Sequence, residues 1–227
     1  MLKVQKAWLV TFMKTGDDKA ILSAIAEIPA STAKDRDALS LSLSFALDDR
    51  DWPQAKQLLE QLEGDEIGGE GDGNFGYATV PVPAGCYSIL LSRLQGDNPE
   101  GVPSFAEARE QLNQKVQASP GNALLLSALD LVDALLTRKE EAIKEARHAT
   151  EMLPISKDAM DGPGVLANLA VVYAWTNESD LAFEQLAVLT KTPHGVYYGQ
   201  LKAGQLWTPI REDPRFEKLL AELAPKE

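Results

Sequence analysis

The sequence predicts an all-α protein built as an array of about five helical hairpins. The first observation is that each hairpin has an alanine where we expect its second helix to begin. These alanines are Ala20, Ala55, Ala108, Ala142 and Ala182. The spacings are therefore 35, 53, 34 and 40 residues, which indicates a repeat with two insertions. The second observation is that apolar residues follow the period of a helix almost throughout. The third is a proline at the expected end of each of the last three hairpins.

The composition is that of a folded protein with an adequate core. Of 227 residues, 44% are hydrophobic and 25% are charged. The formal charge of −12 argues against nucleic acid as a partner, because binding to phosphates needs Lys and Arg. Two aspartates, Asp130 and Asp133, interrupt the longest apolar stretch, so we expect no membrane insertion. The start lacks the features of a secretory signal, which favours a cytoplasmic location.

The inventory of reactive side chains is thin. Cys86 is the one cysteine in the sequence, so an internal disulfide and zinc sites with two or more cysteines are excluded. His148 and His194 are the two histidines, and neither has a nucleophile beside it. We therefore expect no enzyme, no catalytic residues, no metal and no cofactor.

The first third of the chain is the least regular. Residues 1–63 are expected to form two degenerate hairpins, at 8–28 and 39–62, and Asp51 is placed to cap the second helix of the latter. Residues 64–82 are expected to be an acidic, glycine-rich linker that is exposed and mobile from about 64 to 76. Prolines at the end of this linker argue against a paired central strand.

Residues 83–193 are expected to form three better hairpins. The first has a long turn at 96–103, and the clearest unit spans 123–154. The next unit spans 163–193. In both of the later units, small residues let two antiparallel helices approach closely, and a terminal proline stops the second helix.

Residues 194–227 are expected to cap the array. Asp213 can cap a final helix, and Pro214 stands in its first turn. Phe216 begins an apolar stripe at helical spacing, and Trp207 lies on the approach to it. We expect this segment to cover the exposed end of the last hairpin, because helical arrays need such caps.

The last third also resembles a known family. The residues that carry the resemblance are 153–163 (LPISKDAMDGP), 166–174 (LANLAVVYA) and 207–216 (WTPIREDPRF). They resemble the C-terminal tetratricopeptide-repeat (TPR) region of large bacterial regulatory proteins, which usually follows a kinase, a nucleotidyl cyclase or a winged-helix domain. The resemblance implies a TPR-like α-α superhelix with an interaction or sensory role. Because such proteins can carry a membrane span before the array, a periplasmic location stays open.

The resemblance also implies where a partner binds. Such repeats often use an asparagine on a first helix to bind a peptide backbone, and Asn168 has that position. The basic residues that would complete a carboxylate clamp are missing. The expected concave face consists of Leu124, Ser127, Leu131, Asn168, Val171 and Trp175. Two alternatives stay open: Asn168 bonds to a neighbouring helix or loop, and Trp175 packs in the core.

Two other patterns have simpler interpretations. Residues 71–76 match G-x-G-x-x-G, but no strand precedes them and residues 57–92 contain no Lys or Arg to attract a phosphate. Four nearby side chains could be taken for a calcium loop but lack its register. They are Asp65, Glu70, Asp72 and Asn74. Both patterns are expected to be a solvated loop.

The predicted function is that of a non-enzymatic scaffold. We expect the concave face to mediate protein–protein interaction by binding an apolar or amphipathic peptide segment. The negative charge of the chain favours a basic partner at the outer rim. The alternative is a cis-acting regulatory or sensory domain of a bacterial signalling protein. Such a domain could bind a small molecule in a pocket beside residues 197–199.

Overall fold

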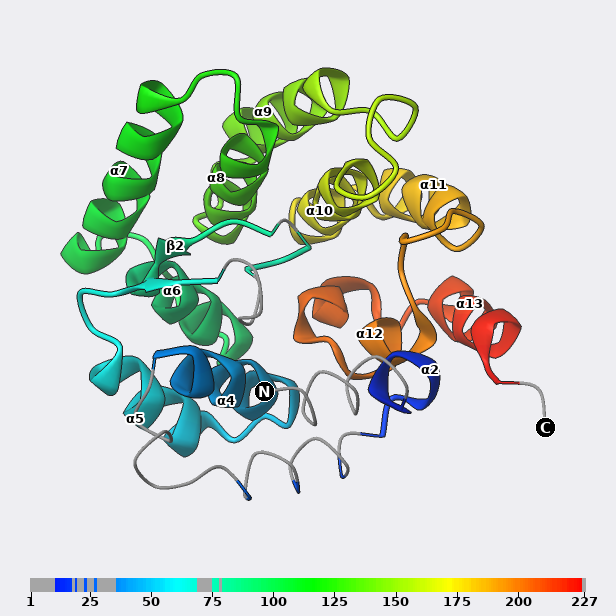
Figure 1. Ribbon diagram of the computed structural model, residues 1–227, viewed down its shortest axis with the longest axis horizontal. Coiled ribbons are helices and arrows are strands. Elements are labelled where there is room, and N and C mark those ends of the chain that lie inside the picture. Colours follow the sequence, from blue (N-terminus) through cyan, green and yellow to red (C-terminus); the bar gives the residue numbers. More distant parts are fainter. Residues whose placement is uncertain are drawn as a thin grey trace.

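The computed structural model describes residues 11–17, 19, 23, 27, 36–68, 75–77 and 79–225. This part of the chain is mostly helical, as predicted, and contains one pair of two-residue strands (Figure 1). The expected hairpin at 8–28 lies largely outside the described residues, apart from the short helix α2 (Met13–Thr15). Of the helices that are described, not one combines the length and apolar character that crossing a bilayer requires.

Helices pair in chain order, which confirms the helices expected between residues 39 and 193. The pairs are α4 (Arg36–Asp48) with α5 (Trp52–Gln61), α6 (Ala84–Leu94) with α7 (Pro103–Ala118), α8 (Ala123–Leu135) with α9 (Lys139–Met152), and α10 (Gly162–Trp175) with α11 (Ser179–Leu189). The first helices also contact each other, α6 with α8 and α8 with α10. They form an inner layer, and α7, α9 and α11 lie outside it (Figure 1).

All four pairs share one turn after their first helix. The helix ends at a residue with positive φ, and the N–H of the next residue donates to the carbonyl five residues back at 2.8–3.0 Å. The residues with positive φ are Arg50, Gly96, Thr137 and Asn177. This is the Schellman arrangement, which satisfies a carbonyl that the helix end would leave free. The same local geometry therefore recurs in each pair.

The expected caps and breaks are present. The Asp51 carboxylate accepts the N–H of Gln54 at 3.1 Å and so caps α5. The prolines Pro120, Pro154 and Pro193 each follow within four residues of the end of a second helix. The beginnings and ends of helices are therefore set by local chemistry.

The α8–α9 pair is close-packed through small residues. The fully buried side chains of α9 are those of Ala142, Ala146 and Ala149. Because the packing around these alanines leaves no room for larger side chains, α9 can pack here only through small residues.

Replacing Ala146 with leucine is expected to lower the free energy of unfolding by about 1–3 kcal/mol, since overpacking forces neighbours off their rotamers. Ala146 is 1% exposed. Chemical denaturation checks this, with Lys144→Leu on the exposed face of α9 as the matched control. A parent-like denaturation curve for Ala146→Leu would contradict the packing described here.

The residues of the expected linker are partly packed. Strand β1 (Glu66–Ile67) pairs antiparallel with β2 (Val82–Pro83), a position at which proline is tolerated because neither strand is central. Ile67 and Phe75 are both 0% exposed, so the prediction of an exposed loop is wrong at these two residues. They are apolar and find places in the core. Residues 69–74 lie outside the described part.

The segment after α11 does more than cover the last pair. It contains α12 (Tyr198–Ala203), the 3₁₀ helix η2 (Gln205–Ile210) and α13 (Pro214–Leu223). The side chain of Gln205 donates to the carbonyl of Asp48 at 2.9 Å, and Arg50 donates to the Gln205 side chain at 3.1 Å. The C-terminal segment therefore reaches back to α4, and α12 contacts α2 (Figure 1).

The final helix has the predicted local structure. Asp213 caps it by accepting the N–H of Arg215 at 2.9 Å, and Phe216 is 1% exposed. A cation in a first turn opposes the helix dipole and needs a carboxylate. The Arg215 guanidinium lies 2.7 Å from Asp180 and 2.8 Å from Asp213. Asp180 belongs to α11, so this ion pair joins the final helix to the last helix pair.

Candidate functional site

The six residues expected on the concave face do lie on the inner helices. Leu124, Ser127 and Leu131 belong to α8, and Asn168, Val171 and Trp175 belong to α10. Four of them are completely buried. These four are Ser127, Leu131, Asn168 and Val171. The expectation of an open face at these positions is therefore wrong.

What Asn168 contacts explains its burial. Its side-chain oxygen accepts the backbone N–H of Tyr77 at 2.7 Å, and its nitrogen donates to the backbone carbonyl and hydroxyl of Ser127 at 3.2 and 3.0 Å. The side-chain amide of Asn168 therefore accepts from the segment that contains Tyr77 and donates to the helix that contains Ser127. We call residues 75–77 the inner segment. Asn168 thus joins the inner segment to α8, which confirms the alternative that it bonds to a neighbouring helix and loop.

Gly76 allows the inner segment to approach this closely. Its φ is +73°, in the left-handed region that glycine adopts without strain. A Cβ atom added here would collide with Asn168 Oδ1 and would lie 2.8 Å from Leu131 Cδ2. No side chain fits at this position, so backbone and amide are in direct contact.

Two aromatic side chains flank Gly76. The ring of Phe75 packs edge-on against Tyr87 with centroids 5.1 Å apart. The hydroxyl of Tyr77 accepts the indole N–H of Trp207 at 2.8 Å, and burial raises the pKa of Tyr77 well above its ordinary value. The inner segment is therefore held by a backbone bond, an enclosed ring and a hydroxyl bond.

Trp175 lies at the edge of this region. Its indole N–H donates to the carbonyl of Leu206 at 2.9 Å, and the Arg93 guanidinium lies 5.5 Å from its ring centroid. The side chain links α10 to η2, so it is half-buried and structural. This supports the alternative of core packing that the sequence left open.

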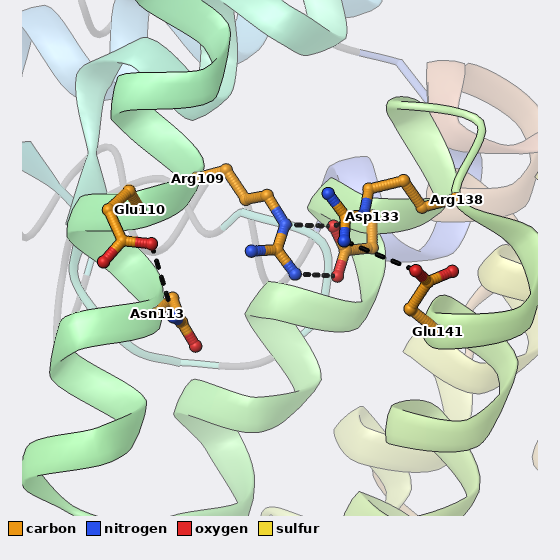
Figure 2. A network of polar contacts seen from close by, with 6 residues as sticks. All are labelled: Arg109, Glu110, Asn113, Asp133, Arg138 and Glu141. Carbon is orange, nitrogen blue, oxygen red and sulfur yellow. Dashed lines mark hydrogen bonds and ion pairs between the residues drawn. The ribbon is translucent and has the colours of Figure 1, made fainter.

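A second cluster is a buried charge network between α7, α8 and α9. Arg109 donates to both oxygens of Asp133 at 2.5 and 2.7 Å, and Arg138 lies 3.3 Å from the same carboxylate (Figure 2). Asp133 is 0% exposed, so one buried carboxylate pairs with two guanidiniums. Sequence reasoning noticed Asp133 only as a break in an apolar stretch. A charge inside an apolar helix is the signal that could have identified it.

Two further acids complete this cluster. Within the described residues, both side-chain oxygens of Asp130 and one of Glu145 are buried and have no hydrogen-bond partner. Burial raises the pKa of Asp130 well above its usual range. Burial, with the nearby Asp133 carboxylate, raises the pKa of Glu145 to about 7. Burial therefore favours the neutral acid form of Asp130, and Glu145 titrates near neutrality.

Stability is expected to fall as pH rises from about 5 to 8. The folded state holds the Glu145 proton more tightly than the unfolded state, so stability is lost between the usual glutamate pKa and the raised one. Discounted for screening at this half-buried side chain, the effect is about 1–2 kcal/mol. Glu145→Gln is expected to flatten the profile in melting curves, and exposed Glu140→Gln serves as the control. An unchanged slope in Glu145→Gln would contradict the assignment.

A cleft of about 530 Å³ opens elsewhere, at the start of α8 and the loop before α10. Its polar walls are already engaged: Asp158 accepts two backbone N–H groups, and Lys157 donates to the carbonyl of Met152. Residues 197–199, where a small-molecule pocket was considered, do not line this cleft. Gly199 instead packs against the backbone of Phe12. Within the described residues, this cleft therefore lies apart from residues 197–199.

The remaining residues considered from the sequence lie apart from both clusters. Cys86 is 0% exposed and burial raises its pKa to about 12, so the thiol is an unreactive core side chain. His148 is exposed on α9. Most of the glycine-rich motif at 71–76, and most of the acids beside it, lie outside the described residues. Among the residues that are described, no three His, Cys, Asp or Glu side chains gather as metal ligands.

Comparison with known proteins gives no further assignment, because no family model, curated protein or solved structure matches the chain.

Proposed function

We propose that this protein is a non-enzymatic, TPR-like helical-repeat scaffold that binds an extended segment of a partner protein on its inner face. The common turn in four successive helix pairs supports the repeat, since one local geometry recurs at corresponding places. Contact of α6 with α8 and of α8 with α10 supports a continuous inner layer.

The contact between Asn168 and the backbone of Tyr77 is the observation that carries the proposal. An amide that accepts a main-chain N–H recognises an extended peptide without regard to its side chain. The inner face thus already holds a stretch of polypeptide that is neither helix nor strand and that turns at Gly76. We interpret the inner segment as an internal ligand that occupies the partner's place.

A partner segment must therefore displace the inner segment. Among the contacts described, two hydrogen bonds hold the inner segment. The backbone N–H of Tyr77 donates to Asn168, and the hydroxyl of Tyr77 accepts from Trp207. Each such bond contributes only about 0.5–1.5 kcal/mol net. The buried Phe75 ring adds a larger apolar contribution, so an incoming segment must supply an equivalent ring to exchange with the inner segment. The charge of −12 favours basic residues at the partner's flanks. A domain joined to this chain would use the same face, which is the cis-acting alternative.

The test is a screen of a random peptide library against three full-length proteins. These are the parent, Gly76→Ala, which strains the inner segment, and Gly76→Ala combined with Asn168→Ala. Circular dichroism and melting curves establish that each is folded. We expect Gly76→Ala to retain peptides that the parent retains weakly, and the double variant to lose them. Failure of folded Gly76→Ala to retain any peptide, or retention unaffected by Asn168→Ala, would contradict the proposed function.

A further inference from the structure

We propose that the inner face selects partner segments of the sequence aromatic–Gly–Tyr, with the glycine in the left-handed conformation. This inference rests on the proposed function and specifies the chemistry of the partner. The inner segment shows which side chains the face accommodates. A different feature of the face recognises each of its three positions.

The middle position is read by steric exclusion. Asn168 Oδ1 and Leu131 Cδ2 leave no space for a Cβ at Gly76, and the φ of +73° strains any L side chain there. Both obstacles come from fully buried side chains on different helices. Neither can withdraw easily, so a segment with any other residue in the middle is rejected.

The third position is read by two hydrogen bonds. Its backbone N–H donates to Asn168, which excludes proline, and its hydroxyl accepts from Trp207 Nε1 at 2.8 Å. Trp207 is 0% exposed, so phenylalanine here would leave a buried indole N–H without this acceptor. An unsatisfied buried donor costs more than the bond contributes, and tyrosine is therefore preferred over phenylalanine.

The first position is read by shape. Phe75 is 0% exposed and meets the Tyr87 ring at 67° with centroids 5.1 Å apart. Edge-on aromatic contacts of this kind favour a ring over an aliphatic side chain of similar size. The enclosed site has room for a ring from only one segment at a time, so the internal and external ligands compete.

The test uses a synthetic peptide with the sequence of residues 73–81, Gly-Asn-Phe-Gly-Tyr-Ala-Thr-Val-Pro. Two control peptides carry Gly→Ala at the middle position or Tyr→Phe at the third. Fluorescence anisotropy measures binding to full-length parent and Gly76→Ala. If Gly76→Ala does not fold, Tyr77→Phe, which removes a single hydroxyl bond, replaces it.

We expect the peptide to bind the variant at least tenfold more tightly than the parent, whose own segment competes. The Gly→Ala peptide should bind at least tenfold more weakly, and the Tyr→Phe peptide about two- to tenfold more weakly. Equal binding of the parent-sequence and Gly→Ala peptides would overturn the selectivity while leaving the proposed function intact. A folded variant that binds library peptides but not this one would do the same. A parent dimer that the peptide dissociates would identify a second copy of this chain as the occupant and overturn the assignment to a partner protein.

Discussion

Replacing Asp133 with alanine is expected to lower the free energy of unfolding by about 2–4 kcal/mol, because it removes a fully buried carboxylate and leaves the partly buried Arg109 guanidinium without its partner. Asp133 is 0% exposed and holds Arg109 from α7 and Arg138 from the start of α9 (Figure 2). The loss of this one side chain therefore removes the polar connection among three helices. Chemical denaturation followed by circular dichroism measures the change.

The matched control is Glu141→Ala, because Glu141 pairs with Arg138 at 3.4 Å in an exposed position. An exposed ion pair of this kind contributes less than about 1 kcal/mol. If the two variants lost the same stability, the Asp133 network would contribute no more than an exposed ion pair. That result would contradict the burial of Asp133 described here.

Replacing Phe216 with alanine is expected to cost about 3–5 kcal/mol, since it truncates a large buried side chain and leaves a cavity. The ring is 1% exposed and the Arg211 guanidinium lies 5.7 Å from its centroid. Because Phe216 lies on α13, which contacts α12, and has no contact with Asn168 among those described, the folded fraction of the variant should bind peptides as the parent does. Thermal melts and the peptide assay measure the two effects separately.

Lys218→Ala on the exposed side of α13 is the control for Phe216→Ala. A Phe216→Ala protein that melts like the parent but no longer binds peptides would reverse the interpretation. The C-terminal segment would then be the binding surface itself, and the inner face would have only a structural role.

Much of the helical fold is predictable because its signals are local. Asp51 and Asp213 were identified as caps from the residues beside them, and each accepts a backbone N–H in the structure. Ala142 of α9 was identified from the spacing of the repeat alone. The caps depend on residues within a turn or two of each other, and a single sequence displays both kinds of signal.

The inner segment was missed because its signals are not local. Its composition is that of an acidic, glycine-rich loop, and loops of that kind are usually exposed. Asn168 contacts Tyr77 across 91 positions of the sequence, and Trp207 contacts it across 130. Phe75 and Ile67 were the available signs, since apolar residues within a polar loop need a place in the core. Asn168 was correctly singled out, but what it holds could not be inferred.

The charge network shows the same limit. The sequence places Asp130 and Asp133 on an apolar helix, but not the arginine 24 positions away that reaches Asp133. Raised pKa values follow from burial and neighbouring charge, and both are products of tertiary packing. The acids were visible in the sequence, whereas their environment was not.

The hydrogen bond between the Tyr77 amide and Asn168 is the contact on which the proposed function depends most. Amide hydrogen exchange, resolved by residue, measures it directly in the parent and in Asn168→Ala. We predict that the Tyr77 amide is protected in the parent and loses protection in the variant, while amides in the middle of α9 exchange equally slowly in both. A Tyr77 amide that exchanges in the parent as fast as in an unstructured peptide would contradict the claim that Asn168 holds the inner segment on the inner face.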